Sequence, residues 1–264
     1  MTTPDVPLRM EFSVELPGTA EQVWEAIATA NGISSWMFPT ELEEREGGAM
    51  RFHMGEDMSA PGTVTGWDPP RRFAYSEPEW AMIAGHPDAP VTPLVSEFLV
   101  EARSGGTCVL RVVSSAFGTG ADWEREFFAE VEKGWKPMFD NNLRLYLTHF
   151  PGQRVTSLSA QTVVPGPGEA VWSAMRQDIG AEAVGDPVKA RGLRGQVERI
   201  GDHRLLLRLA EPVPGLLAAV AMDQGDGTTW TQVEGYLFSE DAPDYVKREQ
   251  PAWKAWLEGL AIPA

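Results

Sequence analysis

A short phrase occurs twice in this chain, and each copy lies where a strand pattern gives way to a helix pattern. Residues 16–27 and residues 164–175 align without a gap, and both contain Pro-Gly, a glutamate three positions later and then Val-Trp. The matched residues are Pro17 and Pro165, Gly18 and Gly166, Glu21 and Glu169, and Val23-Trp24 and Val171-Trp172. We therefore expect two copies of one fold, a complete one in residues 1–151 and a shortened one in residues 152–264.

The first half of the chain is rich in short strand patterns. Residues 10–16 alternate apolar and polar side chains, as a half-buried strand does. Short strands joined by tight turns indicate an antiparallel meander, which the proline-rich stretch 78–93 interrupts as a surface loop or lid. The further strands are expected at residues 40–46, 49–54, 62–68, 72–76, 95–102 and 107–115.

A helix is expected directly after the first copy of the phrase. Thr19 and Gln22 have the spacing of a capping box, and the apolar face that follows predicts a helix that ends at Asn31-Gly32. A short second helix is expected at residues 33–38, before Pro39.

The longest helix pattern covers residues 122–149 and has a broad apolar face. Because Pro137 lacks a backbone donor, we expect this helix to kink or break near Lys133-Gly134. The second half of the chain repeats the order of strand, helix, strands and final helix in a shorter form. Its elements are expected at residues 155–164, 168–178, 196–200, 204–210, 216–222, 229–238 and 242–260.

Composition excludes several classes of function. The formal net charge is −16, and residues 1–150 alone carry −12, so phosphate backbones and anionic lipid surfaces are poor partners. We therefore expect no nucleic acid partner and no membrane insertion. The first thirty residues lack a basic start followed by an apolar stretch, and the apolar run at 215–222 is too short to span a bilayer, which predicts a cytoplasmic protein.

The residues that usually hold metals or cofactors are sparse and scattered. Cys108 is the single cysteine, lies in an apolar run and is expected to be an inert buried thiol. The four histidines have no ligand spacing, and the phosphate-binding and hydrolase motifs are missing. We expect no metal and no cofactor.

The order of elements and several local phrases resemble the START-like, helix-grip superfamily called SRPBCC. The similarity is greatest to the branch of homologues of the heat-shock-protein-90 ATPase activator. It covers nearly all of residues 8–150, and in residues 153–264 it depends on the repeated phrase and the element order. The residues that carry it are 20–27, 33–37, 67–75, Gly105-Gly106-Thr107, Gly134-Trp135, Leu143, Tyr146 and Leu147.

The resemblance implies an α+β fold of tandem helix-grip domains, each an antiparallel sheet wrapped around a long C-terminal helix. In the family a seven-stranded sheet grips the helix and encloses a hydrophobic cavity. Members bind lipids, polyketides and other apolar molecules, some are aromatases or cyclases, and the eukaryotic founders are co-chaperones. The fold alone does not select among these functions.

The side chains expected to line a cavity in the first unit are large, aromatic or sulfur-containing. Such side chains bury much apolar area and adapt to irregular ligands, although they also fill cores by themselves. Asn142 lies on the apolar helix face, where it would orient a ligand or cap the break at Pro137. The candidate lining residues are Trp36, Met37, Phe38, Phe52, Met54, Trp80, Phe127, Val131, Trp135 and Asn142.

Two further residues are candidates for catalysis if the protein is an enzyme. His53 lies in an expected strand, and strand alternation places either Phe52 and Met54 or Arg51 and His53 toward the interior. Arg111 and Glu97 lie in neighbouring expected strands, where they would pair inside the cavity or on the surface.

The sequence therefore predicts a protein that binds an apolar or aromatic small molecule in the first unit without covalent chemistry. One alternative is a polyketide cyclase or aromatase, with His53 and Arg111 as its acid–base groups. A second alternative is a co-chaperone-like module with a protein partner.

Overall fold

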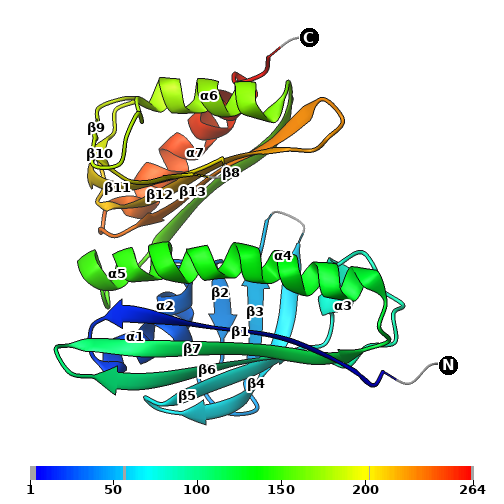
Figure 1. Cartoon of the computed structure of the whole chain (residues 1–264). Helices are drawn as coiled ribbons and strands as arrows, with labels where there is room; N and C mark the ends of the chain where they lie inside the picture. The colour runs from blue at the N-terminus through cyan, green and yellow to red at the C-terminus, as the bar shows by residue number, and fades with distance from the viewer. Residues whose placement is uncertain (1–3, 56–57, 202, 263–264) are drawn as a thin grey trace. The chain divides into compact units, whose positions relative to one another are not determined.

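The computed structural model describes residues 4–55, 58–201 and 203–262. The chain divides into two compact units, 1–152 and 153–264. Each unit combines one antiparallel sheet with helices on the sheet face (Figure 1), so the predicted tandem α+β fold is confirmed.

The first unit is built on a seven-stranded antiparallel sheet with the order β1-β7-β6-β5-β4-β3-β2. The strands alternate buried and exposed side chains, so that one face is apolar and the other is solvated. We call the buried face the inner face. The strands are β1 (Val6–Pro17), β2 (Thr40–Leu42), β3 (Ala49–His53), β4 (Ser59–Asp68), β5 (Arg72–Glu77), β6 (Leu94–Arg103) and β7 (Thr107–Gly118).

Two short helices, α1 (Ala20–Ala28) and α2 (Ala30–Ser34), connect β1 with β2. The predicted capping box is confirmed, because Thr19 N donates to Gln22 Oε1 at 2.9 Å and Gln22 N donates to Thr19 Oγ1 at 3.3 Å. The predicted end of the first helix is wrong. Extended Thr29 ends α1 and caps α2, and Gly32 lies inside α2, where any side chain would overlap the carbonyl oxygen of Glu25.

A long helix crosses the sheet of the first unit (Figure 1). It consists of α4 (Asp122–Met138), a π-helical turn (Phe139–Leu143) and α5 (Arg144–His149). The predicted break near Lys133-Gly134 is wrong, because the helix continues through Pro137 and widens one turn later. A proline cannot donate to the preceding turn, and a π turn is one way in which a helix absorbs that mismatch. Asn141 Nδ2 then donates to the carbonyl oxygen of Pro137 at 2.5 Å.

The second unit contains a six-stranded antiparallel sheet with the order β8-β13-β12-β11-β10-β9. Its apolar core includes Trp172 and Met175 of the first helix and Trp253 and Trp256 of the last. The strands are β8 (Thr156–Pro165), β9 (Pro187–Val188), β10 (Arg194–Gly201), β11 (Arg204–Glu211), β12 (Gly215–Asp223) and β13 (Thr228–Leu237), and the helices are α6 (Gly168–Ile179) and α7 (Ala242–Glu258).

The repeated phrase has the same structural task in both units. Gly18 and Gly166 have φ angles of 108° and 125°, which a side chain rarely tolerates, and each turns the chain from a strand into a helix. Gly18 N donates to the carbonyl oxygen of Gly106, and Gly166 N donates to that of Gly227, both at 2.9 Å. The phrase therefore ties the end of the first strand to the turn before the last strand in each unit.

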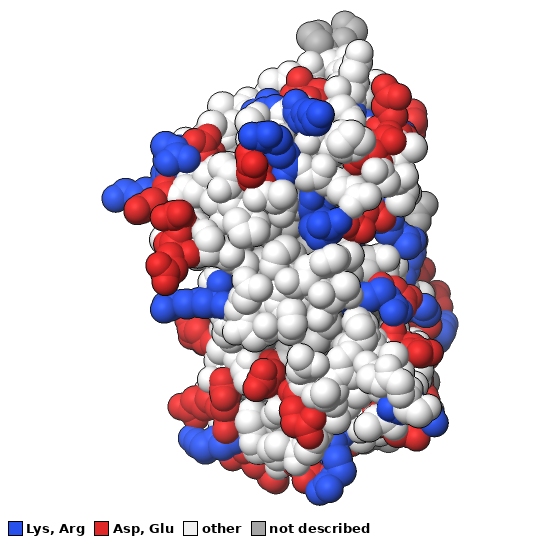
Figure 2. All heavy atoms as spheres, turned by 90° about the vertical axis from the view of Figure 1, so that its left-hand side faces the viewer, with Lys and Arg blue, Asp and Glu red and all other residues white. Residues whose placement is uncertain are grey.

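Acidic and basic side chains are mixed on the face of the molecule in Figure 2. No area of that face is uniformly basic, which agrees with the net charge of −16. Within the described residues, no helix has both the length and the apolar character that a bilayer crossing requires.

Candidate functional site

The interior of the first unit contains a small void between the inner face and the helices. Six of its nine lining residues are aromatic, and they pack edge to face or stacked, with ring centroids such as those of Trp36 and Phe139 4.7 Å apart. The lining residues are Ile27, Ile33, Trp36, Met37, Phe52, Phe73, Tyr75, Phe98 and Phe139.

The void is too small for an organic ligand. Its volume is about 10 Å³, roughly what the centre of one water molecule requires. The aromatic side chains themselves therefore fill most of the space that the sequence analysis assigned to a ligand.

Three of the candidate lining residues, Trp36, Met37 and Phe52, do line this void. Trp36 is fixed there because its Nε1 donates to the carbonyl oxygen of Ala26 at 2.9 Å. Phe38 is partly exposed beside Phe52, and Met54 is partly exposed beyond the end of β3.

Four other candidates form a second aromatic cluster in the same unit. Trp80 of the short helix α3 (Trp80–Ile83) is buried, and its ring centroid lies 5.2 Å from that of Phe127 on α4. Val131 and Trp135 continue this stripe along α4. Trp80 Nε1 donates to the carbonyl oxygen of Thr92 at 2.8 Å, which anchors α3 to the loop that returns to β6.

Asn142 lies in the π-helical turn and is buried. Its Nδ2 donates to the carbonyl oxygen of Trp36 at 3.2 Å, so the amide connects the long helix to the wall of the void. The suggestion that it caps the break at Pro137 is wrong, since its neighbour Asn141 contacts the carbonyl of Pro137.

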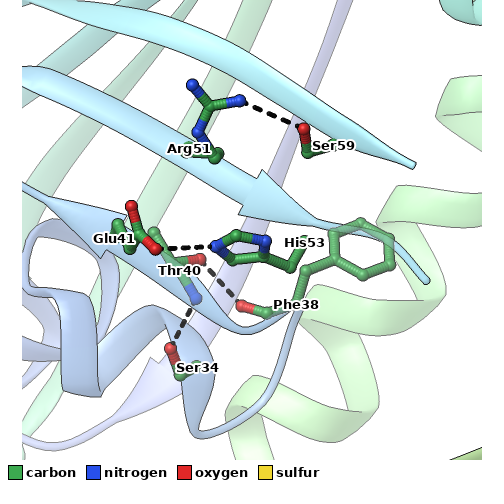
Figure 3. A network of polar contacts seen from close by, with 7 residues as sticks. All are labelled: Ser34, Phe38, Thr40, Glu41, Arg51, His53 and Ser59. Carbon is green, nitrogen blue, oxygen red and sulfur yellow. Dashed lines mark hydrogen bonds and ion pairs between the residues drawn. The ribbon is translucent and has the colours of Figure 1, made fainter. Parts of the chain in front are cut away.

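His53 and Arg111 do not reach the interior. Strand alternation turns Met50 and Phe52 inward, and the His53 side chain remains 42% exposed, with Nε2 3.1 Å from Glu41 Oε1 (Figure 3). The Arg111 side chain is 46% exposed, and its Nε donates to Glu11 Oε1 at 2.6 Å. The alternative in which these two side chains would face a cavity is therefore wrong, and the surface alternative holds for both.

Polar side chains instead form a row across the middle of the inner face. Ser114 of β7 lies opposite Ser96 of β6, which lies opposite Tyr75 of β5. The two serine hydroxyls are fully buried and 2.8 Å apart, which is a hydrogen bond. The hydroxyl of Tyr75 is near Ser96, which lowers its pKa against the larger effect of burial. It has no partner at hydrogen-bond geometry among the described residues, although Tyr75 is 1% exposed. A buried polar atom without a partner is uncommon and indicates either strain or a functional role.

Glu77 extends this set of polar groups. It follows Tyr75 by two residues on the same face of β5, lies opposite Leu94 and is 7% exposed. Among the described residues its carboxyl group has no hydrogen bond and no ion pair. Burial raises the pKa of Glu77 to about 7. Burial, together with the neighbouring Glu77, also raises the pKa of Tyr75.

Tyr75, Glu77, Ser96 and Ser114 were not predicted from the sequence, although a signal for them existed. In each strand they occupy the same alternate positions as buried apolar residues, for example Phe73 before Tyr75 and Phe98 after Ser96. The candidates from the sequence, Glu97 and Arg111, lie on the opposite face, one residue from Ser96 and three residues from Ser114. Glu97 in fact pairs with Arg72 at 2.5 Å on that outer face.

Nothing in the described part of the chain gathers three side chains that could hold a metal ion. The buried polar row of the first unit consists of hydroxyl groups and a carboxyl group beside aromatic side chains.

Comparison with solved structures finds proteins of similar arrangement at low identity. Protein MLL2253 from Mesorhizobium loti is 16% identical with a TM-score of 0.47, covering 54% of this chain and 98% of its own. The di-domain ARO/CYC protein BexL of the BE-7585A biosynthetic pathway is 14% identical with a TM-score of 0.45, covering 96% and 97%. The Aha1 dimer from Colwellia psychrerythraea is 14% identical with a TM-score of 0.42, covering 53% and 96%.

Comparison with curated proteins finds no match. The sequence model of one family, described as Activator of Hsp90 ATPase homolog 1-like protein, matches residues 17–148, which is half of the chain. This segment runs from the first copy of the repeated phrase to α5 and includes the void and the buried polar row. The chain therefore belongs to the family of Activator of Hsp90 ATPase homolog 1-like proteins, the branch of the SRPBCC superfamily that its sequence resembles.

Proposed function

We propose that the interior of the first unit binds a small, mainly apolar molecule between the inner face and the long helix. The observation that carries this proposal is the hydroxyl of Tyr75, which is buried in the wall of the void and has no hydrogen-bond partner in the described part of the chain. A ligand oxygen or nitrogen at that place would supply the missing hydrogen bond. The aromatic wall would supply affinity at roughly 25 cal/mol per Å² of apolar surface buried, before the costs of ordering.

Binding requires the interior to open, because the void holds no more than about one water molecule. The least regular connection between strands of this unit is residues 78–93, which contain only the four-residue helix α3. Its Trp80 packs in the aromatic cluster on α4, and the ring centroid of Trp135 in that cluster lies 6.3 Å from that of Phe139 at the void. We propose that this segment and the aromatic cluster around Trp80 move when a ligand enters. The exposed Met82 shows that α3 is only partly packed.

A cyclase or aromatase is the second candidate, and one observation favours it. The raised pKa of Glu77, about 7, would let this carboxyl group donate or accept a proton near neutral pH inside an apolar site. Tyr75 and Glu77 would then replace His53 and Arg111 as the acid–base groups. A protein-interaction role would instead use the outer surface and leave the interior closed.

Native mass spectrometry of the full chain, purified without added ligand, tests the proposal. We expect a co-purifying small molecule, or saturable uptake of one neutral apolar dye such as Nile red per chain. Tyr75→Phe should weaken binding several-fold, and the matched control Tyr236→Phe in the second unit should not. An empty protein that takes up no neutral apolar probe would overturn the proposal.

A further inference from the structure

The carboxyl group of Glu77 is unusual because it is buried without a cation. The outer face of the same sheet pairs its charges, as Arg72 with Glu97 and Arg111 with Glu11. Glu77 has no such partner among the described residues and lies on the inner face beside Tyr75, whose hydroxyl is also unpartnered. A buried carboxyl group without a partner costs free energy of folding, and such groups concentrate at functional sites.

The side chains next to Glu77 supply no partner for its carboxyl group. Gly62 of β4 lies beside it in close packing, because a Cβ at Gly62 would lie 3.7 Å from Glu77 Cγ, 3.3 Å from Met50 Cγ and 3.0 Å from the carbonyl oxygen of Ser76. On the other side lies Leu94 of β6, part of the cluster around Trp80. These neighbours offer no hydrogen-bond donor from a side chain.

The aromatic ring next to Glu77 on the inner face of β5 is that of Tyr75, which stacks with Phe98 with centroids 5.8 Å apart. Phe73 and Phe98 lie opposite each other four residues further along β5 and β6. Aromatic faces and a carboxylate together are the recurring surroundings of bound ammonium groups. The net charge of −12 on residues 1–150 also attracts cations and repels anions.

We propose that the ligand of this site is an apolar molecule that carries a protonated amine, with its nitrogen at the carboxylate of Glu77. Residues 75 and 77 are about 7 Å apart along the strand, so an amine at Glu77 places the apolar part of the ligand against Tyr75 and the wall of the void. This inference rests on the proposed binding function and names its class of ligand.

The pH dependence of binding follows from the groups around Glu77. Tyr75 is the titratable side chain coupled to it, while Gly62, Met50 and Leu94 on the neighbouring strands do not titrate. On the covering segments, α3 has no charged residue, the loop after it carries His86, which stacks on Trp123, and α4 carries the buried Glu124, which accepts hydrogen bonds from Thr119 and Gly120. The other α4 side chains at this cluster are the apolar Phe127, Phe128, Val131 and Trp135. An amine requires the carboxylate form of Glu77, whose pKa is raised by burial to about 7 in the free protein. Affinity for an amine should therefore fall about tenfold per pH unit below pH 7 and level off above it.

Calorimetric titration of the full chain with three probes of one shape tests this inference. The probes are 2-(1-naphthyl)ethylamine, 2-(1-naphthyl)ethanol and 1-naphthylacetate. At pH 7.5 we expect the amine to bind at least about tenfold more tightly than the alcohol, and the carboxylate to bind weakest. Glu77→Gln should abolish the preference for the amine and leave alcohol binding within about twofold. Glu97→Gln, on the outer face, should change neither.

The outcomes separate this inference from the proposed function. If the alcohol binds as tightly as the amine in the wild type, or if Glu77→Gln retains the preference, the amine inference is wrong while the binding site stands. If none of the three probes binds, both are wrong. Should Glu77→Gln fail to fold, the wild-type pH profile decides, because amine affinity that does not change between pH 5.5 and 7.5 contradicts the role of Glu77.

Discussion

At the scale of single residues, four polar groups on an apolar face explain what is unusual about this molecule. Ser96 and Ser114 satisfy each other, but Tyr75 and Glu77 enter the interior without a hydrogen-bond partner among the described residues. Removing polar groups from water without compensation opposes folding. The free protein therefore carries a free-energy cost at Tyr75 and Glu77 that a suitable ligand would remove.

The substitution Tyr75→Phe tests whether the hydroxyl of Tyr75 lowers the stability of the ligand-free protein. A buried tyrosine with a good partner usually loses about 0.5–1.5 kcal/mol when its hydroxyl is removed. Because the hydroxyl of Tyr75 has no hydrogen-bond partner among the residues that the structure describes, we expect the free energy of unfolding of the ligand-free variant to be unchanged or slightly raised. Urea denaturation of both proteins measures this, and a loss of more than about 1 kcal/mol would show that the hydroxyl is bonded in the folded state.

Glu77 should make stability depend on pH in an unusual direction. The folded-state pKa of about 7 lies above the ordinary value of 4.5, so the folded protein binds a proton that the unfolded chain releases. Stability should therefore fall as pH rises from about 4.5 to 7, by about 3 kcal/mol from this group.

The variant Glu77→Gln isolates this effect. The pH dependence of its free energy of unfolding should lack the contribution of Glu77. The variant should therefore be more stable than the wild type above pH 7. Glu234, whose pKa is also raised to about 7, is present in both proteins and cancels in the difference. Parallel pH profiles of the two proteins between pH 4.5 and 7.5 would contradict the assignment.

At the scale of elements, most of the order of strands and helices could be predicted from the sequence. Alternation located β1, turn residues between short β-rich stretches located β3, β6 and β7, and the capping box located the start of α1. The face of each strand could not be fixed from one strand alone, since a shift of one residue exchanges inside and outside. That is why Glu97 and Arg111 were considered for the site while Ser96 and Ser114 were overlooked.

The course of the long helix depends on contacts that local sequence does not reveal. The effect of Pro137 emerges one turn later, as a π turn whose side chains contact the wall of the void. The sequence also did not reveal that aromatic side chains fill most of the cavity, because this depends on how six aromatic rings from several elements pack together.

Glu124 should stabilise the turn at residues 119–121 that leads into α4. The residue is fully buried, accepts from Thr119 N at 2.8 Å, Thr119 Oγ1 at 2.9 Å and Gly120 N at 2.9 Å, and leaves no room for a side chain at Gly118. Burial alone would raise the pKa of Glu124, but these hydrogen bonds outweigh it and lower the pKa.

We expect Glu124→Gln to lower the free energy of unfolding at pH 7 by about 1–3 kcal/mol. Because the folded-state pKa is lowered, this stabilisation is present above the ordinary pKa of a glutamate and is lost as the pH falls through the folded value. Thermal unfolding at pH 7 and at pH 3 measures both parts. A difference between the two proteins that grows at low pH would contradict this role.

Asn142 should hold the long helix to the wall of the void. Its Nδ2 is the donor to the carbonyl oxygen of Trp36, so Asn142→Ala leaves that carbonyl without this donor and opens a small gap. We expect a loss of about 1–3 kcal/mol in the free energy of unfolding. Thr148→Ala, on the exposed side of α5, serves as a control and should cost much less. Equal effects of the two substitutions would contradict the role of Asn142 in holding the long helix.

At the scale of the whole molecule, the repeated phrase identifies the two units because both use it for the same turn. Gly18 and Gly166 bond to the turns at Gly106 and Gly227, so the same residues recur where the same backbone geometry recurs. No repeated sequence pattern marks the residues of the buried polar row. They come together only through the register in which β5, β6 and β7 pair. Fold was therefore readable from the sequence to a greater extent than the site.

Photolabelling of the full chain tests the central claim, that the interior of the first unit admits an apolar molecule. A neutral aromatic probe with a diazirine group would be activated on the bound protein, and the labelled residues would be mapped by mass spectrometry. We predict saturable labelling at Met37, Phe52, Tyr75, Phe98 and Phe139, reduced by an excess of unlabelled probe. Labelling that does not saturate, or that falls only on exposed apolar residues such as Phe117, would contradict the account.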